Sequence, residues 1–141
     1  MLQGIKLATK SEEIKKILQL SRTIAVVGSS PSPERDSNHI TQFLNLKGYK
    51  IFPVNPNYQE ILGLKCYPRL QDIPEAIEIV DVFIRPENIL PIVKDAVACK
   101  AKTIWFQLGV STPEAVEYAL QNQLTVVDNK CIMVEHRRLI E

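Results

Sequence analysis

The chain has 141 residues, of which 45% are apolar and 23% charged, values typical of one soluble globular domain with a core of its own. Its 17 basic and 16 acidic residues nearly cancel, which excludes a broad basic surface for nucleic acid or an anionic membrane, so any anion site must be local. No apolar run reaches the roughly 18 residues of a membrane span, and residues 1–13 lack a signal-peptide core. We therefore expect a cytoplasmic protein.

The first predicted elements are a helix and a βα unit. Thr9 and Glu12 have capping-box spacing and precede apolar positions that recur on one helical face up to residue 20. An apolar strand follows over residues 24–27, and it ends at Gly28 in a loop of serines and prolines. A helical pattern begins near Ser37 and stops at Gly48.

Further strands and helices alternate along the rest of the chain. Strands are predicted over residues 50–54, 79–84, 102–108 and 124–127, and helices over 89–97 and 113–122. The second of these helices has a threonine cap, Thr112, and a proline at its first position. Residues 61–74 are predicted as a loop with at most a short helical turn, and residues 135–141 as a polar tail.

Continuous apolar strands that alternate with helices are typical of a parallel sheet covered on both faces. We predict an α/β fold, a Rossmann-like doubly wound sheet of about five strands, in a single domain over residues 1–141. In such folds ligands bind where the carboxyl ends of the strands meet. Four loops should converge there, over residues 28–38, 55–58, 85–88 and 107–111.

The sequence of the loop after the first strand limits the classes of ligand that the site could bind. A glycine followed by small hydroxyl residues and a helix start favours a phosphate group, although Gly28 could also serve only to turn the chain. The GxGxxG motif of NAD sites is missing, and the second strand ends at Asn55 instead of a carboxylate. NAD is therefore disfavoured. The loop also lacks the GKS or GKT sequence of a Walker A motif, whose lysine and hydroxyl bind the phosphates and metal of a nucleotide triphosphate.

Five signatures in order, VVGSSPSPERDSN, FPVNPNY, VDVFIRPENI, IWFQLGV and VVDNKC, resemble the small single-domain CoA-binding proteins. These are similar in turn to the N-terminal CoA-binding domain of the succinyl-CoA synthetase alpha subunit. The resemblance covers residues 12–139, and it implies that coenzyme A lies across the carboxyl edge of the sheet. The residues it implies in binding are Gly28, Ser29, Ser30, Arg35, Asn55, Pro56, Ile84, Arg85, Pro86, Gln107, Leu108 and Gly109.

The same resemblance implies a CoA-binding or regulatory module without catalytic residues, because the phosphorylated histidine of the synthetase lies outside this domain. Free CoA or an acyl-CoA would be the ligand, and a protein partner or a homo-oligomer would be the further partners. The opening loop departs from the family, since SSPSPER replaces the glycine-rich turn of the synthetase. An NAD(P)-binding redox enzyme or sensor of the same fold is the first alternative.

A thiol-active or acyl-CoA-active enzyme built on Cys131 is the second alternative. Cys66, Cys99 and Cys131 are too far apart to suggest disulfides or a zinc site, and a buried structural thiol is the favoured interpretation of Cys131. With two histidines and no carboxylate cluster, no metal site is expected.

Several implied site residues also have purely structural interpretations. Arg35 could be a solvated charge, Arg85 could pair with Glu87 or Asp81, and Asn55 with Pro56 could form a simple turn. Trp105 and Phe106 are expected in the core.

Overall fold

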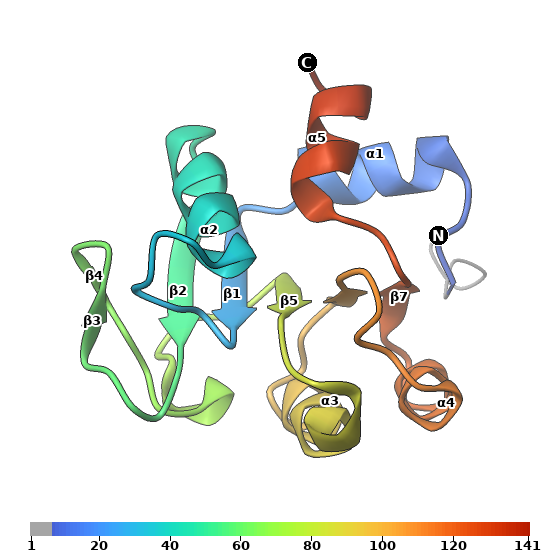
Figure 1. The fold of residues 1–141 in the computed structure, drawn as a ribbon. Helices are drawn as coiled ribbons and strands as arrows, with labels where there is room; N and C mark the ends of the chain where they lie inside the picture. Colours follow the sequence, from blue (N-terminus) through green and yellow to red (C-terminus); the bar gives the residue numbers. More distant parts are fainter. Residues whose placement is uncertain (1–6) are drawn as a thin grey trace.

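A computed structural model describes residues 7–141, which form an open sheet of five parallel strands with helices on both faces (Figure 1). The strands lie in the order β2-β1-β5-β6-β7, and each neighbouring pair is parallel. Their bounds are β1 Thr23–Val27, β2 Lys50–Val54, β5 Ile79–Val82, β6 Thr103–Phe106 and β7 Thr125–Val127. The predicted doubly wound α/β fold is confirmed.

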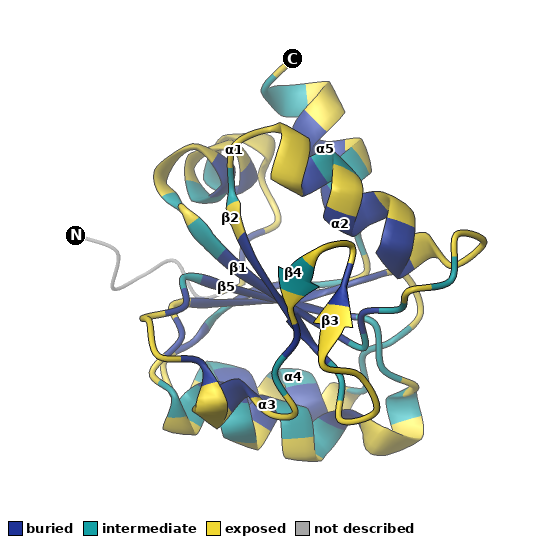
Figure 2. Ribbon diagram, turned by 90° about the vertical axis from the view of Figure 1, so that its left-hand side faces the viewer, coloured by how far each residue is buried: buried dark blue, intermediate teal, exposed yellow. Residues whose placement is uncertain are grey.

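The two faces of the sheet are covered by different helices. Ile24 and Val26 of β1 pack with helices α1 (Ser11–Leu20), α2 (Asp36–Leu46) and α5 (Ile132–Leu139). Ala25 and Val27 face the other way, toward α3 (Ile89–Ala98) and α4 (Pro113–Gln121). Successive strand residues point to opposite faces, so a strand buried on both faces is mostly apolar along its length. Figure 2 shows this division: the buried strands lie between the helices, whose outer surfaces are exposed.

Two helix starts illustrate how sequence sets local structure. Thr112 caps α4 as predicted, because its Oγ1 accepts a hydrogen bond of 3.1 Å from the N–H of Ala115. At α1 the predicted partner was wrong by one position. The carboxylate of Glu13, and not of Glu12, accepts bonds from the N–H groups of Thr9 and Lys10.

The segment after β2 is more ordered than predicted. It contains a small antiparallel pair, β3 (Glu60–Ile61) with β4 (Leu64–Lys65), and a 3-10 turn η1 (Leu70–Asp72). The pair was missed because each strand has two residues, too few to show a period. Ile61 and Leu70 are buried, so the segment packs on the domain at these points.

The predicted polar tail was also wrong, because residues 132–139 form α5. Ile132 and His136 are buried on the face of α5 toward the domain, while Arg137 and Arg138 are exposed. The His136 ring meets the rings of Phe43 and Tyr49 edge-on, at centroid distances of 5.4 and 5.8 Å. Arg137 and Arg138 therefore lie on the outer face of an amphipathic helix, whereas Glu135 is buried.

Trp105 and Phe106 are fully buried in β6, as predicted. None of the helices within residues 7–141 has the length and apolar character needed to cross a bilayer. The signal-peptide inference rested partly on residues 1–6, which lie outside the described part of the chain.

Asp81 lies in the middle of β5, in register with Val26 of β1 and Trp105 of β6. Its side chain is fully buried, and neither carboxyl oxygen has a hydrogen-bond partner in the described chain. Burial raises the pKa of Asp81 well above its ordinary value, because desolvation penalises the charged form. The alternative in which Arg85 pairs with Asp81 on the surface is therefore wrong.

This buried carboxyl should make folding stability depend on pH. Between the unfolded-state pKa of about 3.9 and the raised folded-state pKa, the folded state binds more protons, so the free energy of unfolding falls as pH rises. Each unit of pKa difference is worth about 1.4 kcal/mol. Asp81→Asn has no carboxyl to ionise at this position. Its free energy of unfolding should therefore rise relative to that of the wild type between pH 4 and pH 8.

Urea unfolding at several pH values measures the effect, with Glu12→Gln on the exposed face of α1 as the control. Glu12→Gln should follow the wild-type pH profile. Parallel profiles for Asp81→Asn and the wild type would show that Asp81 is not held protonated.

Candidate functional site

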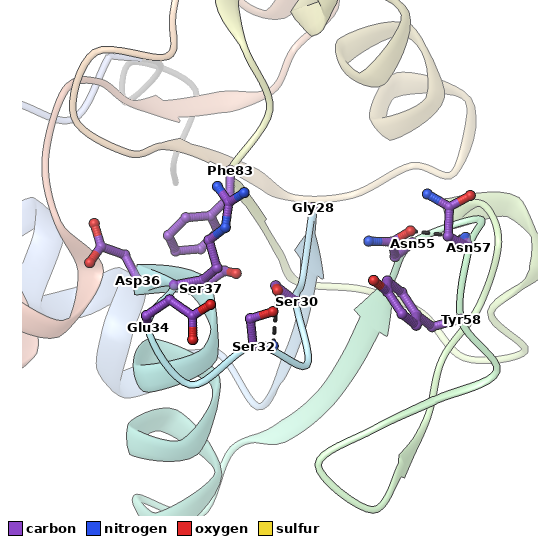
Figure 3. Close-up of a pocket in the computed structure, with 11 residues that line it drawn as sticks. Gly28, Ser30, Ser32, Glu34, Asp36, Ser37, Asn55, Asn57, Tyr58 and Phe83 are labelled. Carbon is purple, nitrogen blue, oxygen red and sulfur yellow. Dashed lines mark hydrogen bonds between the residues drawn. The ribbon is translucent and has the colours of Figure 1, made fainter.

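The loops after β1, β2, β5 and β6 meet at the carboxyl edge of the sheet, where three adjoining cavities open. The first, the loop cavity, has a volume of about 530 Å³ and lies between the β1 loop and the β2 loop (Figure 3). It is lined by Gly28, Ser30, Ser32, Glu34, Arg35, Asp36, Ser37, Asn55, Asn57, Tyr58 and Phe83. The cavity lies at the end of β1, which has β2 on one side in the sheet and β5 on the other.

Gly28 begins this loop in a conformation that only glycine adopts easily, with φ of +86°. A Cβ atom at this position would lie 2.5 Å from the carbonyl oxygen of Phe83, which is backbone and cannot rotate away. The N–H of Gly28 donates to the carbonyl of Val54 at 3.0 Å. The glycine is therefore required by the packing of β1 against β5, whatever the cavity holds.

Two buried or half-buried asparagines shape the β1 loop. Asn55 Nδ2 donates to the carbonyl of Ser29, and Asn38 Nδ2 donates to the carbonyl of Ser30, both at 2.9 Å. The N–H groups of Ser29 and Ser30 have no acceptor within residues 7–141. The loop thus has its carbonyls bound to the protein and two N–H donors left for a ligand.

Helix α2 begins at Asp36, directly after the loop, so its amino end lies at the cavity. The partial positive charge of a helix amino end favours an anion. Arg35 is exposed and forms no ion pair within the described residues. The carboxylates of Glu34 and Asp36 also line the cavity, so its charge is mixed.

The β2 loop forms the opposite wall, where Figure 3 shows Asn55, Asn57 and Tyr58 together. Both ends of the Asn55 amide are used within the protein, because its Oδ1 accepts from the N–H of Asn57 at 2.9 Å. The thiol of Cys66 donates to the Asn55 carbonyl at 3.5 Å, and burial raises the pKa of that thiol. Asn55 therefore connects the two loops and shapes the cavity between them.

The second cavity, the β2-edge cavity, has a volume of about 400 Å³ and shares Gly28, Asn55 and Asn57 with the loop cavity. Pro56 and Ile84 contribute apolar surface. Arg69 and Asp95 contribute charges.

The third, the α5 cavity, has a volume of about 680 Å³ and is mainly apolar. It shares Asp36 and Phe83 with the loop cavity and Ile84 with the β2-edge cavity. Its lining is Asp36, His39, Ile40, Phe83, Ile84, Arg85, Pro86, Gln107, Leu108, Val110, Cys131, Met133 and Val134. The three cavities therefore form a continuous surface along the sheet edge.

The structure brings together most of the predicted site residues. Those that line a cavity are Gly28, Ser30, Arg35, Asn55, Pro56, Ile84, Arg85, Pro86, Gln107 and Leu108. Ser29 and Gly109 lie outside all three cavities. The Ser29 side chain is fully buried with an unpartnered hydroxyl, and Gly109 donates its N–H to Asn129 at 2.9 Å.

Sequence reasoning missed the cavity residues of α5, Met133 and Val134, because this helix was predicted as a tail. Cys131, expected as a buried thiol, is half-buried and lines the same cavity. Tyr58 and Phe83 were missed too, although both lie within the predicted loops or at their borders. The described chain contains no group of three His, Cys, Asp or Glu side chains arranged for a metal ion.

Comparison with known proteins identifies the family of the chain. A family model described as a CoA binding domain matches residues 22–137. The uncharacterized protein YneT of Bacillus subtilis is 39% identical over 124 residues, 88% of this chain and 92% of that protein. A structure of a hypothetical protein from Pyrococcus horikoshii is 43% identical with a TM-score of 0.93, and the match covers 95% of this chain and 94% of that one.

A larger relative is an ADP-forming acetate–CoA ligase II of Archaeoglobus fulgidus, 38% identical over 72 residues. That match covers 50% of this chain and only 10% of the ligase. The chain therefore corresponds to a small part of that enzyme. From the family match, the chain belongs to the CoA-binding domain family.

Proposed function

We propose that this protein binds coenzyme A, free or as an acyl-CoA, at the carboxyl edge of its sheet and serves as a binding or regulatory module without catalysis of its own. The observation that carries the proposal is the β1 loop. Its carbonyls at Ser29 and Ser30 are bound by asparagine amides, and its N–H groups there are unused within the described chain. Membership of the CoA-binding domain family supports the same ligand.

The phosphates of CoA fit the loop cavity best. They would meet the N–H groups of Ser29 and Ser30, the amino end of α2 and the unpaired Arg35 guanidinium. The nearby carboxylates of Glu34 and Asp36 disfavour a bare anion, but they can accept hydrogen bonds from hydroxyl or amino groups of the same ligand. A ligand with phosphates and such donors suits this mixed charge.

The two flanking cavities suit the two ends of CoA. The β2-edge cavity offers Pro56 and Ile84 to the adenosine half, and the larger α5 cavity can hold the pantetheine arm. The arm carries two methyl groups and two amides, which match an apolar lining with a few polar groups.

The end of β2 supports CoA over a nicotinamide dinucleotide. NAD sites place a carboxylate there for the ribose hydroxyls. This chain has Asn55, whose amide is already bonded to Ser29 and Asn57. A neutral amide that is already bonded at both ends is a weaker partner for the ribose hydroxyls than a carboxylate would be.

Thermal unfolding with CoA, dephospho-CoA and NAD in parallel tests the ligand. At about 100 times its Kd, a bound ligand adds roughly 2.7 kcal/mol of stability. For a chain of this size this raises Tm by roughly 6–10 °C. CoA should produce this rise, and dephospho-CoA a smaller one, because it lacks the 3′-phosphate. Stabilisation by NAD with none by CoA would contradict the proposal.

Arg35→Ala should weaken CoA binding because it removes a charge-assisted contact with phosphate. A loss of about 1.5–3 kcal/mol corresponds to a Kd roughly 10 to 150 times higher. Isothermal titration calorimetry measures the change. Arg22→Ala is the matched control, since Arg22 is an exposed arginine just before β1, at the opposite edge of the sheet. Equal Kd values for the two variants would assign Arg35 to the solvated surface.

A further inference from the structure

The three cysteines lie in different surroundings. Cys66 is buried beside the β2 loop, and its thiol is bonded to Asn55. Cys99 follows α3 and precedes β6, so it lies toward the amino edge of the sheet, away from the cavities. Cys131 is half-buried and lines the α5 cavity. Among the three, only Cys131 lies where a ligand that extends from the loop cavity would end.

The backbone around Cys131 is held in place from both sides. Trp105 Nε1, on a fully buried ring, donates to the carbonyl of Lys130 at 2.8 Å. The N–H of Ile132 donates to Gln107 Oε1 at 3.2 Å. Cys131 is also the residue directly before the first turn of α5. Its sulfur is therefore presented to the cavity from a fixed position.

Gln107 supplies an independent indication of a ligand. It is only 6% exposed, lines the same cavity and uses Oε1 for the bond to Ile132. Its Nε2 has no hydrogen-bond partner within residues 7–141. Because the Oε1 bond to Ile132 fixes the side chain, the Nε2 hydrogens are available at the cavity as donors to a ligand carbonyl. The pantetheine arm has two amide carbonyls and ends in a thiol.

We propose that Cys131 is a redox modification site that forms a reversible mixed disulfide with CoA bound in the α5 cavity. This inference rests on the proposed CoA-binding function. The oxidant is CoA disulfide, and the Cys131 thiol first loses its proton to solvent. The thiolate attacks one CoA sulfur, a new S–S bond forms as the old one breaks, and the second CoA leaves as a thiolate that takes up a proton.

The mixed disulfide would make occupancy of the site depend on a second variable besides CoA concentration. Reversible binding follows the concentration of CoA, whereas the mixed disulfide also follows its oxidation state. A reducing thiol reverses the step by the same exchange and releases CoA. The site would then couple CoA binding to redox conditions without any change of fold.

Intact-protein mass spectrometry after exposure to CoA disulfide tests this proposal. The expected result is one added CoA per chain, mapped to Cys131 by peptide analysis and removed by a reducing thiol. Cys131→Ser should lose the adduct, and Cys99→Ser, which changes a half-buried thiol outside the cavity, should keep it. Adduct formation should be at least about ten times faster with CoA disulfide than with glutathione disulfide, because the CoA portion binds first.

An adduct on Cys66 or Cys99, no adduct, or equal rates with the two disulfides would overturn the proposal. The peptide map of the wild type assigns the cysteine even if Cys131→Ser does not fold. CoA titration of the reduced wild-type protein distinguishes failure of the redox step from failure of the proposed CoA-binding function. Binding without an adduct removes only the redox step, whereas no binding removes the proposed function as well.

Discussion

The carboxyl end of β1 is fixed by backbone hydrogen bonds to both of its neighbours. The N–H of Gly28 donates to Val54 of β2, and the N–H of Phe83 donates to the Val27 carbonyl at 2.8 Å. Between these bonds the chain turns so close to Phe83 that a Cβ atom on residue 28 would clash with backbone. Because the strand order reverses at β1, this close approach sets where the β1 loop leaves the sheet and where the loop cavity opens.

A near-neutral protein can bind an anion in this way without a basic surface. The net charge is +1, and the loop cavity itself contains two carboxylates beside one arginine. Selectivity for phosphate then depends on fixed N–H groups and a helix amino end more than on net charge. The asparagines that hold the loop carbonyls are therefore as important to the proposed site as the residues that would touch the ligand.

The fold could be predicted because the interior of each main strand is apolar, apart from Asp81 in β5, and the helices alternate with the strands. Thr112 with Pro113 even located the start of α4 correctly. The α5 helix could not be recognised in the same way, since its buried face includes Glu135 and His136, which look like surface residues in a sequence. The contacts of His136 with Phe43 and Tyr49 exist only in the folded chain.

The site was predictable at the level of loops, because the carboxyl ends of parallel strands share one edge. Individual side chains were not. Ser29 follows Gly28 as a phosphate ligand would, yet its side chain is buried, and only its backbone N–H is left for a ligand. Cys131 was expected to be a buried structural thiol, whereas in the structure it precedes α5 and lines a cavity. These differences arise from side-chain direction, which sequence spacing does not determine.

The most direct test of the account is a mass spectrum of small molecules released from the purified, denatured protein. The account predicts CoA or an acyl-CoA, at up to one equivalent per chain. Release of a nicotinamide dinucleotide, from a protein that takes up no added CoA, would contradict it.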